Sequence, residues 1–345
     1  MQISDFDYQL PEELIAQHPL TERDASRMLI LDRGTQSWRD SEFKALPDHL
    51  REGDVVVINN TRVFPARLRA KRVPSGGAVE LLLLREVETN VWEALTRPAR
   101  RLQTGAKIDF AESALHAEVI DELPNGVRLI KFDSDEPLEH VIDRIGETPL
   151  PPYINRKAGT SSEDRTRYQT VYAKDRGAIA APTAGLHFTS AVLERLMSRG
   201  VQIVEIILHV GHGTFEPVRV TDVAEHKVAP ERFSISDNAA RTINEARGGG
   251  SRIVAVGTTT TRALESAVAP AGEVKAGSGF AGLTIMPGYE FRIVDALLTN
   301  FHLPQSSLLM LVCAFAGREF MLTAYRHAVK EGYRFYSYGD CMLIV

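Results

Sequence analysis

The segment Arg252–Ser266, RIVAVGTTTTRALES, decides the fold class, because a buried strand passes through a single glycine directly into a helix. The run IVAV is short, apolar and rich in valine, which is typical of a strand covered on both faces. The same order recurs in VQIVEIILHV (201–210) before DNAARTINEARGGG (237–250), and in FRIVDALLT (291–299) before SSLLMLVCAFAG (306–317). This alternation predicts an α/β fold with a mixed or parallel sheet and helices on both faces.

The two ends of the chain supply further elements of the same α/β fold. DVVVI (54–58) and CMLIV (341–345) are expected to be strands, and PEELIAQ (11–17) a short helix. Between them, short strand-like segments alternate with the turn signals SGG, QTG and LPNG, which is typical of a small antiparallel β-barrel. We therefore expect an inserted β-barrel domain at 63–150 and a discontinuous α/β catalytic domain formed by 1–62 and 151–345.

The composition is that of an ordinary globular protein, with 44% hydrophobic and 25% charged residues and a formal net charge of −5. Its two cysteines, Cys313 and Cys341, stand among apolar neighbours and are expected to be buried, as in a reducing compartment. The acidic N-terminus has no apolar signal region, and the uncharged stretch 296–317 contains too many polar residues for a membrane span. These features predict a soluble cytoplasmic protein.

Polar loops punctuated by glycine or proline stand where strands are expected to end. Ligands of open α/β sheets bind at the carboxyl ends of strands, so these loops are candidates for one shared site. Ordinary turn and capping chemistry is the alternative for each loop taken alone. The loops are PTAGLHFT (182–189), GHGTFEP (211–217), GTTTTR (257–262) and NFHLPQSS (300–307).

Two short patterns in these loops resemble known binding motifs. A glycine and a run of threonines entering a helix can hold an anion on free backbone N–H groups, or Thr260 and Thr261 can simply cap the helix. The patterns GxxxxGK[ST] and GxGxxG are absent, so neither ATP nor NAD is indicated. His209 and His212 form an HxxH that spans a strand end and a glycine turn, and we expect no metal there.

Positive charge is concentrated at the start of the expected barrel, where five Lys/Arg and no acidic residue occur between Arg62 and Arg72. The stretch is either a solvated strand face or a surface for nucleic-acid phosphates. Under the second interpretation, we expect a nucleic acid to contact Arg62, Arg67, Arg69, Lys71, Arg72, Arg97, Arg100 and Arg101.

Read together, long segments of the chain resemble the S-adenosylmethionine:tRNA ribosyltransferase-isomerase family of queuosine biosynthesis. The matching segments run in order from Ser4 to Ile344, so the likeness covers the whole chain. They are SDFDYQLPEELIAQHP, NNTRVFPARL, LPPYI, YQTVYA, AAPTAGLHFT, LHVGHGTFEPV, AVGTTTTRALES, PGYEFRIVDALLTNFHLPQSSLLMLVCAFAG and YRFYSYGDCMLI.

The resemblance implies an α/β fold with an inserted barrel, and it implies a reaction. The ribosyl part of S-adenosylmethionine is transferred to 7-aminomethyl-7-deazaguanine (preQ1) in the tRNA anticodon and isomerised, giving epoxyqueuosine-tRNA with release of adenine and methionine. The chain departs from the family pattern at Val228-Ala229-Pro230, where Ala229 replaces a histidine. A paralogue of the same fold acting on a small molecule, and a non-catalytic RNA-binding protein, are the alternatives.

The implied chemistry needs a base for a C5′ proton beside the sulfonium and an acid for the departing adenine. Histidine suits proton transfer near neutral pH, so the catalytic candidates are His187, His209, Asp340 and His302. The candidates for binding the donor S-adenosylmethionine are Thr183, Gly185, Thr214, Gly257, Thr258, Thr259 and Arg262. We expect tRNA as the partner, through its preQ1-containing anticodon loop, and neither an obligate protein partner nor a metal.

Overall fold

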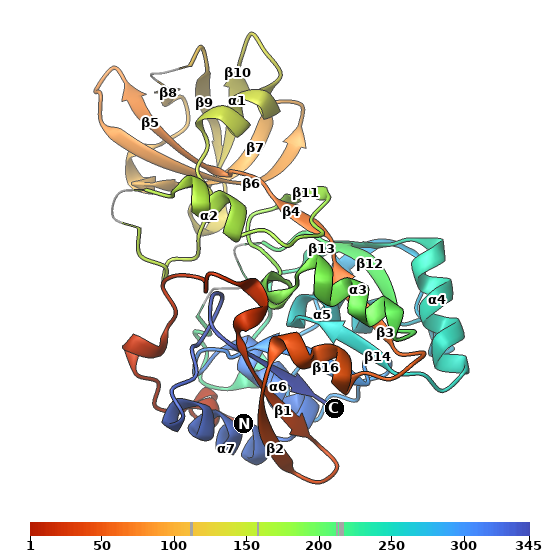
Figure 1. The fold of residues 1–345 in the computed structure, drawn as a ribbon. Helices are drawn as coiled ribbons and strands as arrows, with labels where there is room; N and C mark the ends of the chain where they lie inside the picture. The colour runs from red at the N-terminus through yellow and green to blue at the C-terminus, as the bar shows by residue number, and fades with distance from the viewer. Residues whose placement is uncertain (111–112, 157–158, 212, 214–216) are drawn as a thin grey trace.

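The computed structural model describes residues 1–345 except 111–112, 157–158, 212 and 214–216. It has two lobes (Figure 1): a barrel stands on one end of a larger body that contains both chain termini. We refer to these lobes as the barrel and the body.

The body is built on a nine-stranded mixed sheet. Its central strands β12, β3, β14 and β16 are mutually parallel, whereas β17 runs antiparallel to β16 and the strands at both edges pair antiparallel. The spatial order is β15 (Gly277–Ala281), β13 (Glu231–Ile235), β12 (Gln202–Leu208), β3 (Val55–Asn59), β14 (Ile253–Val256), β16 (Ala296–Asn300), β17 (Cys341–Ile344), β1 (Arg27–Asp32) and β2 (Ser37–Glu42).

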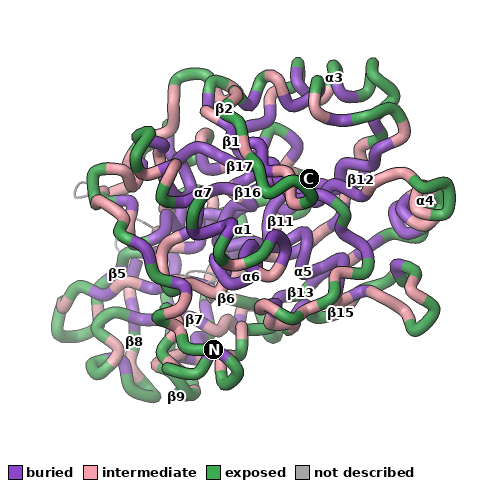
Figure 2. The backbone as a smooth tube through the Cα atoms, turned by 90° about the horizontal axis from the view of Figure 1, so that it is seen from below, coloured by how far each residue is buried: buried purple, intermediate pink, exposed green. Residues whose placement is uncertain are grey.

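Helices cover both faces of this sheet, as the strand–helix alternation predicted. One face packs against α4 (Asp237–Gly248), α5 (Thr258–Ser266), α6 (Ser307–Ala316) and α7 (Arg318–Lys330). The other packs against α3 (Ser190–Ser198) and the 3-10 helices η4 (Phe43–His49) and η7 (Thr183–His187). Burial therefore runs continuously through the sheet, which Figure 2 shows as a purple interior.

The smaller lobe is a closed antiparallel barrel, which confirms the predicted architecture. Its interior is filled by alternate residues of each strand, among them Leu68, Leu81 and Ile130, and α1 (Leu138–Ile145) packs against the same core. The strands are, in spatial order, β10 (Val127–Asp133), β7 (Val91–Arg97), β6 (Ala78–Glu88), β5 (Arg67–Val73), β8 (Lys107–Asp109) and β9 (His116–Glu122).

Two local predictions were wrong. PEELIAQ forms only a single 3-10 turn, η2 (Glu12–Leu14), after which the chain extends to bridge Ile15 with Phe335. The segment before PTAGLHFT ends in β11 (Asp175–Ala178), which pairs with β4 (Thr61–Val63) in a separate two-stranded sheet rather than joining the main sheet. That small sheet lies at the junction of the two lobes, beside α2 (Ser162–Arg167) (Figure 1).

Among the described residues, no single helix has the length and hydropathy to cross a membrane. The consecutive helices α6 and α7 meet those criteria only as a pair, bent by 116° at the break between them.

Candidate active site

Three of the four polar loops follow strands of the main sheet, and residues of the loops 182–189, 257–262 and 300–307 meet at one cavity. This cavity has a volume of about 30 Å³, and we call it the strand-end cavity. Its wall consists of residues from η7, from the end of β12, from the start of α5, from the end of β16 and from the loop before β17. They are Ala181, Pro182, Thr183, Ala184, Val210, Gly257, Thr258, Thr259, Thr299, Asn300, His302, Leu308, Tyr336 and Ser337.

The start of α5 contributes hydrogen-bond donors to this cavity. Gly257 precedes the helix with φ of +91°, a conformation that favours glycine, and no side chain caps the first turn. The first N–H groups of a helix have no partner within it, so those of the first turn of α5 point outward at Thr258 and Thr259. The hydroxyls of these two threonines also make no hydrogen bond to any described residue. The turn can therefore receive an anionic or carbonyl group.

The alternative explanation of GTTTTR, helix capping by Thr260 or Thr261, is wrong. The Thr260 hydroxyl donates backward to the Val256 carbonyl at 2.7 Å, and the Thr261 hydroxyl donates to the Gly257 carbonyl at 3.1 Å. Both threonines thus fix the end of the strand and the turn, while leaving the N–H groups of the first helical turn uncapped.

His187 is completely enclosed behind the cavity wall. The Asn300 amide lies 3.1 Å from its Nε2 and the Ser26 hydroxyl 2.9 Å from its Nδ1, so both ring nitrogens have partners. Because an amide donates to Nε2, the ring is neutral with its proton on Nδ1. Burial, assisted by the charges of Arg334 and Arg23, lowers the pKa of His187 to about 4. These contacts favour a role in orienting Asn300 over one in proton transfer.

His302 lines the cavity but is equally constrained. Its Nε2 lies 3.1 Å from the Thr299 hydroxyl, and its main chain is tied to two phenols, accepting from Tyr8 and donating to Tyr325. Burial lowers the pKa of His302 to about 3, so the ring is neutral at any physiological pH. Asn300, by contrast, keeps a buried Oδ1 that receives no hydrogen bond from the described residues.

Asp340 lies outside the cavity wall and holds a turn together. Its two oxygens accept the backbone N–H groups of Arg27 at 2.9 Å and Arg334 at 2.8 Å. Burial raises the pKa of Asp340, and the two N–H groups act in the opposite direction. The carboxylate joins β1 to the loop before β17, which is a structural use of the side chain.

His209 is the most open of the four catalytic candidates. It stands at the end of β12, half-buried, with its Nδ1 2.8 Å from the Thr61 hydroxyl. Burial and the nearby charge of Arg232 lower the pKa of His209, which favours the neutral ring. Its neighbours in the predicted loop, His212 and Thr214, lie outside the described residues.

Arg262 does not present a free guanidinium to a ligand. It is buried on α5, where Nη1 pairs with Glu231 at 2.8 Å and Nη2 donates to the carbonyls of Ala229 and Ala281. Glu231 also accepts the Gly211 N–H at 2.9 Å, so this ion pair joins α5 to the loop after β12. The predicted role of Arg262 in binding the donor is therefore not supported by its position.

The two residues predicted in PTAGLHFT have different surroundings. Thr183 lines the strand-end cavity. Gly185 packs directly against Tyr172, and a Cβ at this position would overlap the Tyr172 hydroxyl. The glycine is thus required for close packing of η7 and does not face the cavity.

Sequence reasoning missed the aromatic wall of the cavity. Tyr336 has φ of +73° and packs its ring 4.1 Å from that of Tyr153, while the Tyr153 phenol contacts the Ser337 hydroxyl. A non-glycine residue in this conformation is strained and is common at functional sites. The sequence YSYGD (336–340) could have indicated a site, since its tyrosines and serine precede the apolar strand at the C-terminus. The positive φ of Tyr336 could not be predicted from these residues.

A second and larger space lies between the barrel and the body. This groove, of about 640 Å³, is walled by β5, β6 and β7 on one side and by the segment 149–156 on the other. Ile179 and Ala180 line the groove, and the next residues of the chain, Ala181 and Pro182, line the strand-end cavity. One short segment therefore separates the two spaces.

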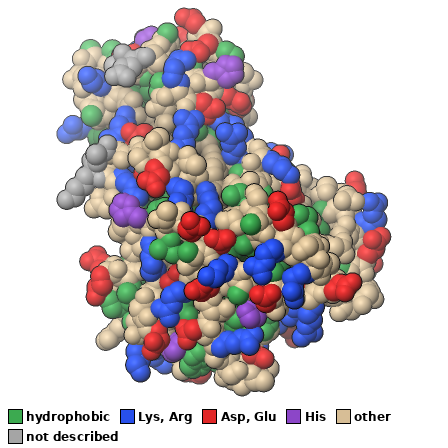
Figure 3. Space-filling view, viewed as in Figure 1, with side chains coloured by type: hydrophobic (Ala, Val, Ile, Leu, Met, Phe, Trp, Pro, Cys, Tyr) green, Lys and Arg blue, Asp and Glu red, His purple; other side chains and the backbone are tan. Residues whose placement is uncertain are grey.

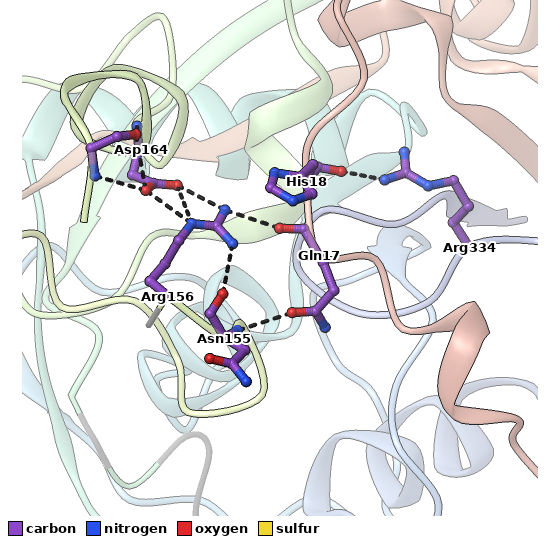
Figure 4. A network of polar contacts seen from close by, with 7 residues as sticks. Gln17, His18, Asn155, Arg156, Asp164 and Arg334 are labelled. Atoms are coloured by element: carbon purple, nitrogen blue, oxygen red, sulfur yellow. Dashed lines mark hydrogen bonds and ion pairs between the residues drawn. The ribbon is translucent and has the colours of Figure 1, made fainter. Parts of the chain in front are cut away.

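Polar contacts hold the body side of the groove in place (Figure 4). Arg156 forms a two-point ion pair with Asp164, at 2.9 and 3.0 Å, and donates to the Gln17 carbonyl at 3.0 Å. The Gln17 amide oxygen accepts the Asn155 N–H at 2.9 Å, and Arg334 donates to the next carbonyl along the chain. The N-terminal segment thus fixes the loop that follows the barrel.

The predicted tRNA-binding residues differ in their position relative to the groove. Arg67, Arg69 and Arg97 line the groove. Arg72 turns away, donating to the Ser75 hydroxyl and the Arg101 carbonyl. The remaining predicted residues, Arg62, Lys71, Arg100 and Arg101, are exposed outside the groove. Figure 3 shows Lys and Arg interspersed with acidic side chains where the lobes meet.

Within the described residues, no group of three or more His, Cys, Asp or Glu side chains is arranged to hold a metal ion.

The fold is that of an α/β enzyme with an inserted barrel, and the two adjoining spaces are its candidate site. A family model described as queuosine biosynthesis protein matches residues 3–344. An S-adenosylmethionine:tRNA ribosyltransferase-isomerase of Desulforamulus reducens is 48% identical over 345 residues, the whole of both chains. A crystal structure of S-adenosylmethionine tRNA ribosyltransferase from Thermotoga maritima is 38% identical, with a TM-score of 0.57 over 99% of this chain and 100% of that one. The chain belongs to the queuosine biosynthesis protein family, and the resemblance indicated by its motifs is confirmed.

Proposed function

We propose that the chain transfers and isomerises the ribosyl part of S-adenosylmethionine onto preQ1 in a tRNA anticodon, releasing adenine and methionine. The product is epoxyqueuosine-tRNA. The observation that carries the proposal is the match of the whole chain to this family, together with a polar strand-end cavity beside a groove lined by four arginines.

The strand-end cavity fits one polar end of the donor and not the whole molecule. A volume of about 30 Å³ holds roughly one water, so the donor has to extend along residues 179–182 toward the groove. In this arrangement the N–H groups and hydroxyls of Thr258 and Thr259 receive the methionine carboxylate. Asn300 Oδ1, which has no donor among the described residues, accepts from the ammonium or ribose.

We assign proton removal from C5′ to His209 in preference to the other candidates. Its lowered pKa keeps the ring neutral near pH 7, and Thr61 holds Nδ1, which leaves Nε2 for the substrate. His187 acts as a positioning residue, because it is buried and holds the Asn300 amide. Asp340 and His302 hold the surrounding loops.

The tRNA partner follows from the reaction, and its anticodon loop is expected to reach the cavity through the groove. A cytoplasmic location accords with a tRNA substrate. The departure at Ala229 does not remove a polar contact from the cavity, since Arg262 binds the main-chain carbonyl there and not the side chain.

The deciding experiment is incubation with S-adenosylmethionine and preQ1-containing tRNA, followed by chromatography of released adenine. Adenine release that depends on tRNA supports the proposal. Release without tRNA indicates a small-molecule paralogue, and tRNA binding without release indicates a non-catalytic RNA-binding protein.

A further inference from the structure

The barrel wall of the groove has a regular chemical pattern. Residues of β5, β6 and β7 that face outward stand opposite one another in two neighbouring rows. One row is Arg67, Leu82 and Leu95, and the next is Arg69, Glu80 and Arg97. The rows come from alternate residues of each strand, so they share one face of the barrel.

The first row gives the groove an apolar floor. Leu82 and Leu95 are half-buried and face the body, where Ile154 and Ile179 line the opposite side. An apolar slot of this kind, within the usual size range of ligand pockets at about 640 Å³, accepts a flat base away from water.

Both rows contribute arginines to the groove, and the protein leaves part of this positive charge unpaired. Four arginines and two glutamates line the groove. Arg69 is held by Glu147 at 2.7 Å and Arg156 by Asp164, but the side chain of Arg97 is exposed and makes no hydrogen bond or ion pair with any described residue. Arg67 donates through Nη2 to the Leu150 carbonyl, and its buried Nε has no partner in the described chain.

We propose that the groove is a slot for an unpaired ribonucleotide of the tRNA substrate, with its base on Leu82 and Leu95 and its phosphate at Arg97 and Arg67. An apolar floor bordered by guanidinium groups is complementary to a base attached to a phosphodiester, and single-stranded RNA is recognised through unstacked bases. The slot ends at residues 179–182, so a nucleotide in it leads the neighbouring base toward the strand-end cavity. The inference rests on the proposed function, since it takes tRNA as the substrate.

The test uses the full-length protein and a tRNA anticodon stem-loop that carries 2-aminopurine at single unpaired positions. Arg97→Ala is expected to weaken stem-loop binding about tenfold, the effect of losing one charge-assisted hydrogen bond. It should also reduce the slope of log affinity against log salt by about 0.7. Leu95→Ala is expected to weaken binding about threefold and to reduce the fluorescence change of one 2-aminopurine position.

Matched controls separate the groove from the rest of the barrel. Lys131→Ala removes an exposed charge from β10, and Leu84→Ala removes a half-buried leucine from β6, but neither residue lines the groove. Both controls should bind the stem-loop as the wild type does. All variants should bind S-adenosylmethionine with unchanged affinity in calorimetry.

Three outcomes overturn the proposal. The first is wild-type stem-loop affinity and salt slope in both Arg97→Ala and Leu95→Ala, and the second is loss of S-adenosylmethionine affinity in them instead. The third is a wild-type protein that does not bind the stem-loop, which overturns the proposed function as well. Groove-dependent binding without adenine release would leave the slot standing and would contradict only the proposed function.

Discussion

The side chains predicted for catalysis and donor binding differ from those of the groove in how they are bonded. Three of the predicted side chains of the body bond to other residues of the protein: His187 to Asn300, His302 to Thr299, and Arg262 to Glu231. In the groove, the Arg97 side chain has no hydrogen-bond or ion-pair partner among the described residues. A polar motif in a sequence thus does not reveal whether its groups are satisfied internally or kept for a ligand.

Mutations of internally bonded groups and mutations of free groups should therefore have different effects. Loss of an internally satisfied group should lower stability, because its partners remain buried and unpaired. Loss of a free group should lower binding or catalysis at little cost to the fold. The following predictions test this division, beginning with the largest effect.

His209→Ala is expected to slow adenine release by about 10²–10⁴-fold, the usual contribution of a general base. The pKa of His209 is lowered by burial, so the acidic limb of kcat/KM in the wild type should lie below pH 6.5. His49→Ala is the matched control, because His49 is also half-buried with a pKa lowered by burial, but it stands at the end of η4 beside Arg39 and not at a strand-end loop. Turnover near the wild-type rate in His209→Ala would reassign the base.

The buried histidines predict loss of stability in acid. The pKa of His187 is about 4 and that of His302 about 3 in the folded protein, against about 6.5 unfolded. Below pH 6.5 the unfolded chain binds protons that the folded chain excludes, so stability falls as pH falls from 6.5 toward 4. Each histidine should contribute about 2–3 kcal/mol of loss by pH 4.5.

Urea unfolding at pH 7.0, 5.5 and 4.5 measures this slope, and His187→Asn should flatten it even where it lowers stability at pH 7. Equal slopes in the wild type and the variant would show that His187 is open to protonation, which would return it to the catalytic candidates.

Mutations of basic residues outside the groove should weaken tRNA binding less than mutations of arginines in the groove. Lys71 and Arg100 are exposed on the barrel but outside the groove, so the Lys71→Ala/Arg100→Ala double variant should weaken stem-loop binding only about twofold, through long-range attraction. Binding assays at two salt concentrations measure this. A double variant as weak as Arg97→Ala would favour the broad basic surface that the sequence predicted.

The sequence was a good guide to elements and a poor guide to pairing. Valine-rich runs and helix periodicity predicted β3, β12, β14, α4 and α5, because burial on both faces leaves a strong apolar pattern. Thr189 caps α3, because its side chain accepts the Val192 N–H. The helix predicted for PEELIAQ is wrong, because only Glu12–Leu14 form a helical turn. The next residue, Ile15, pairs instead with Phe335, which lies near the other end of the chain.

The candidate site shows the same limit. Residues of three of the four polar loops line one cavity, and two of these loops follow the neighbouring strands β14 and β16. Which of their side chains face the cavity depends on contacts between distant segments. Asp340 accepts a hydrogen bond from the Arg27 N–H, and Arg262 forms an ion pair with Glu231. Neither partner belongs to the motif that contains the predicted residue, so the sequence motif could not reveal these contacts.

The smallest predicted effect concerns Ala229, where the chain departs from the pattern of the family it resembles. Ala229 lies beside Gly213, and Arg262 Nη2 donates to its carbonyl at 3.3 Å. The space around it, about 10 Å³, is lined mainly by apolar side chains such as Leu308 and does not include the strand-end cavity. An imidazole at 229 would therefore have to turn outward, and the main-chain bond to Arg262 would persist. Ala229→His should change the rate of adenine release less than about twofold, or about 0.4 kcal/mol of barrier. Single-turnover rates of the two proteins measure this, and an increase above about tenfold would place residue 229 in the reaction and mark the natural chain as a diverged paralogue.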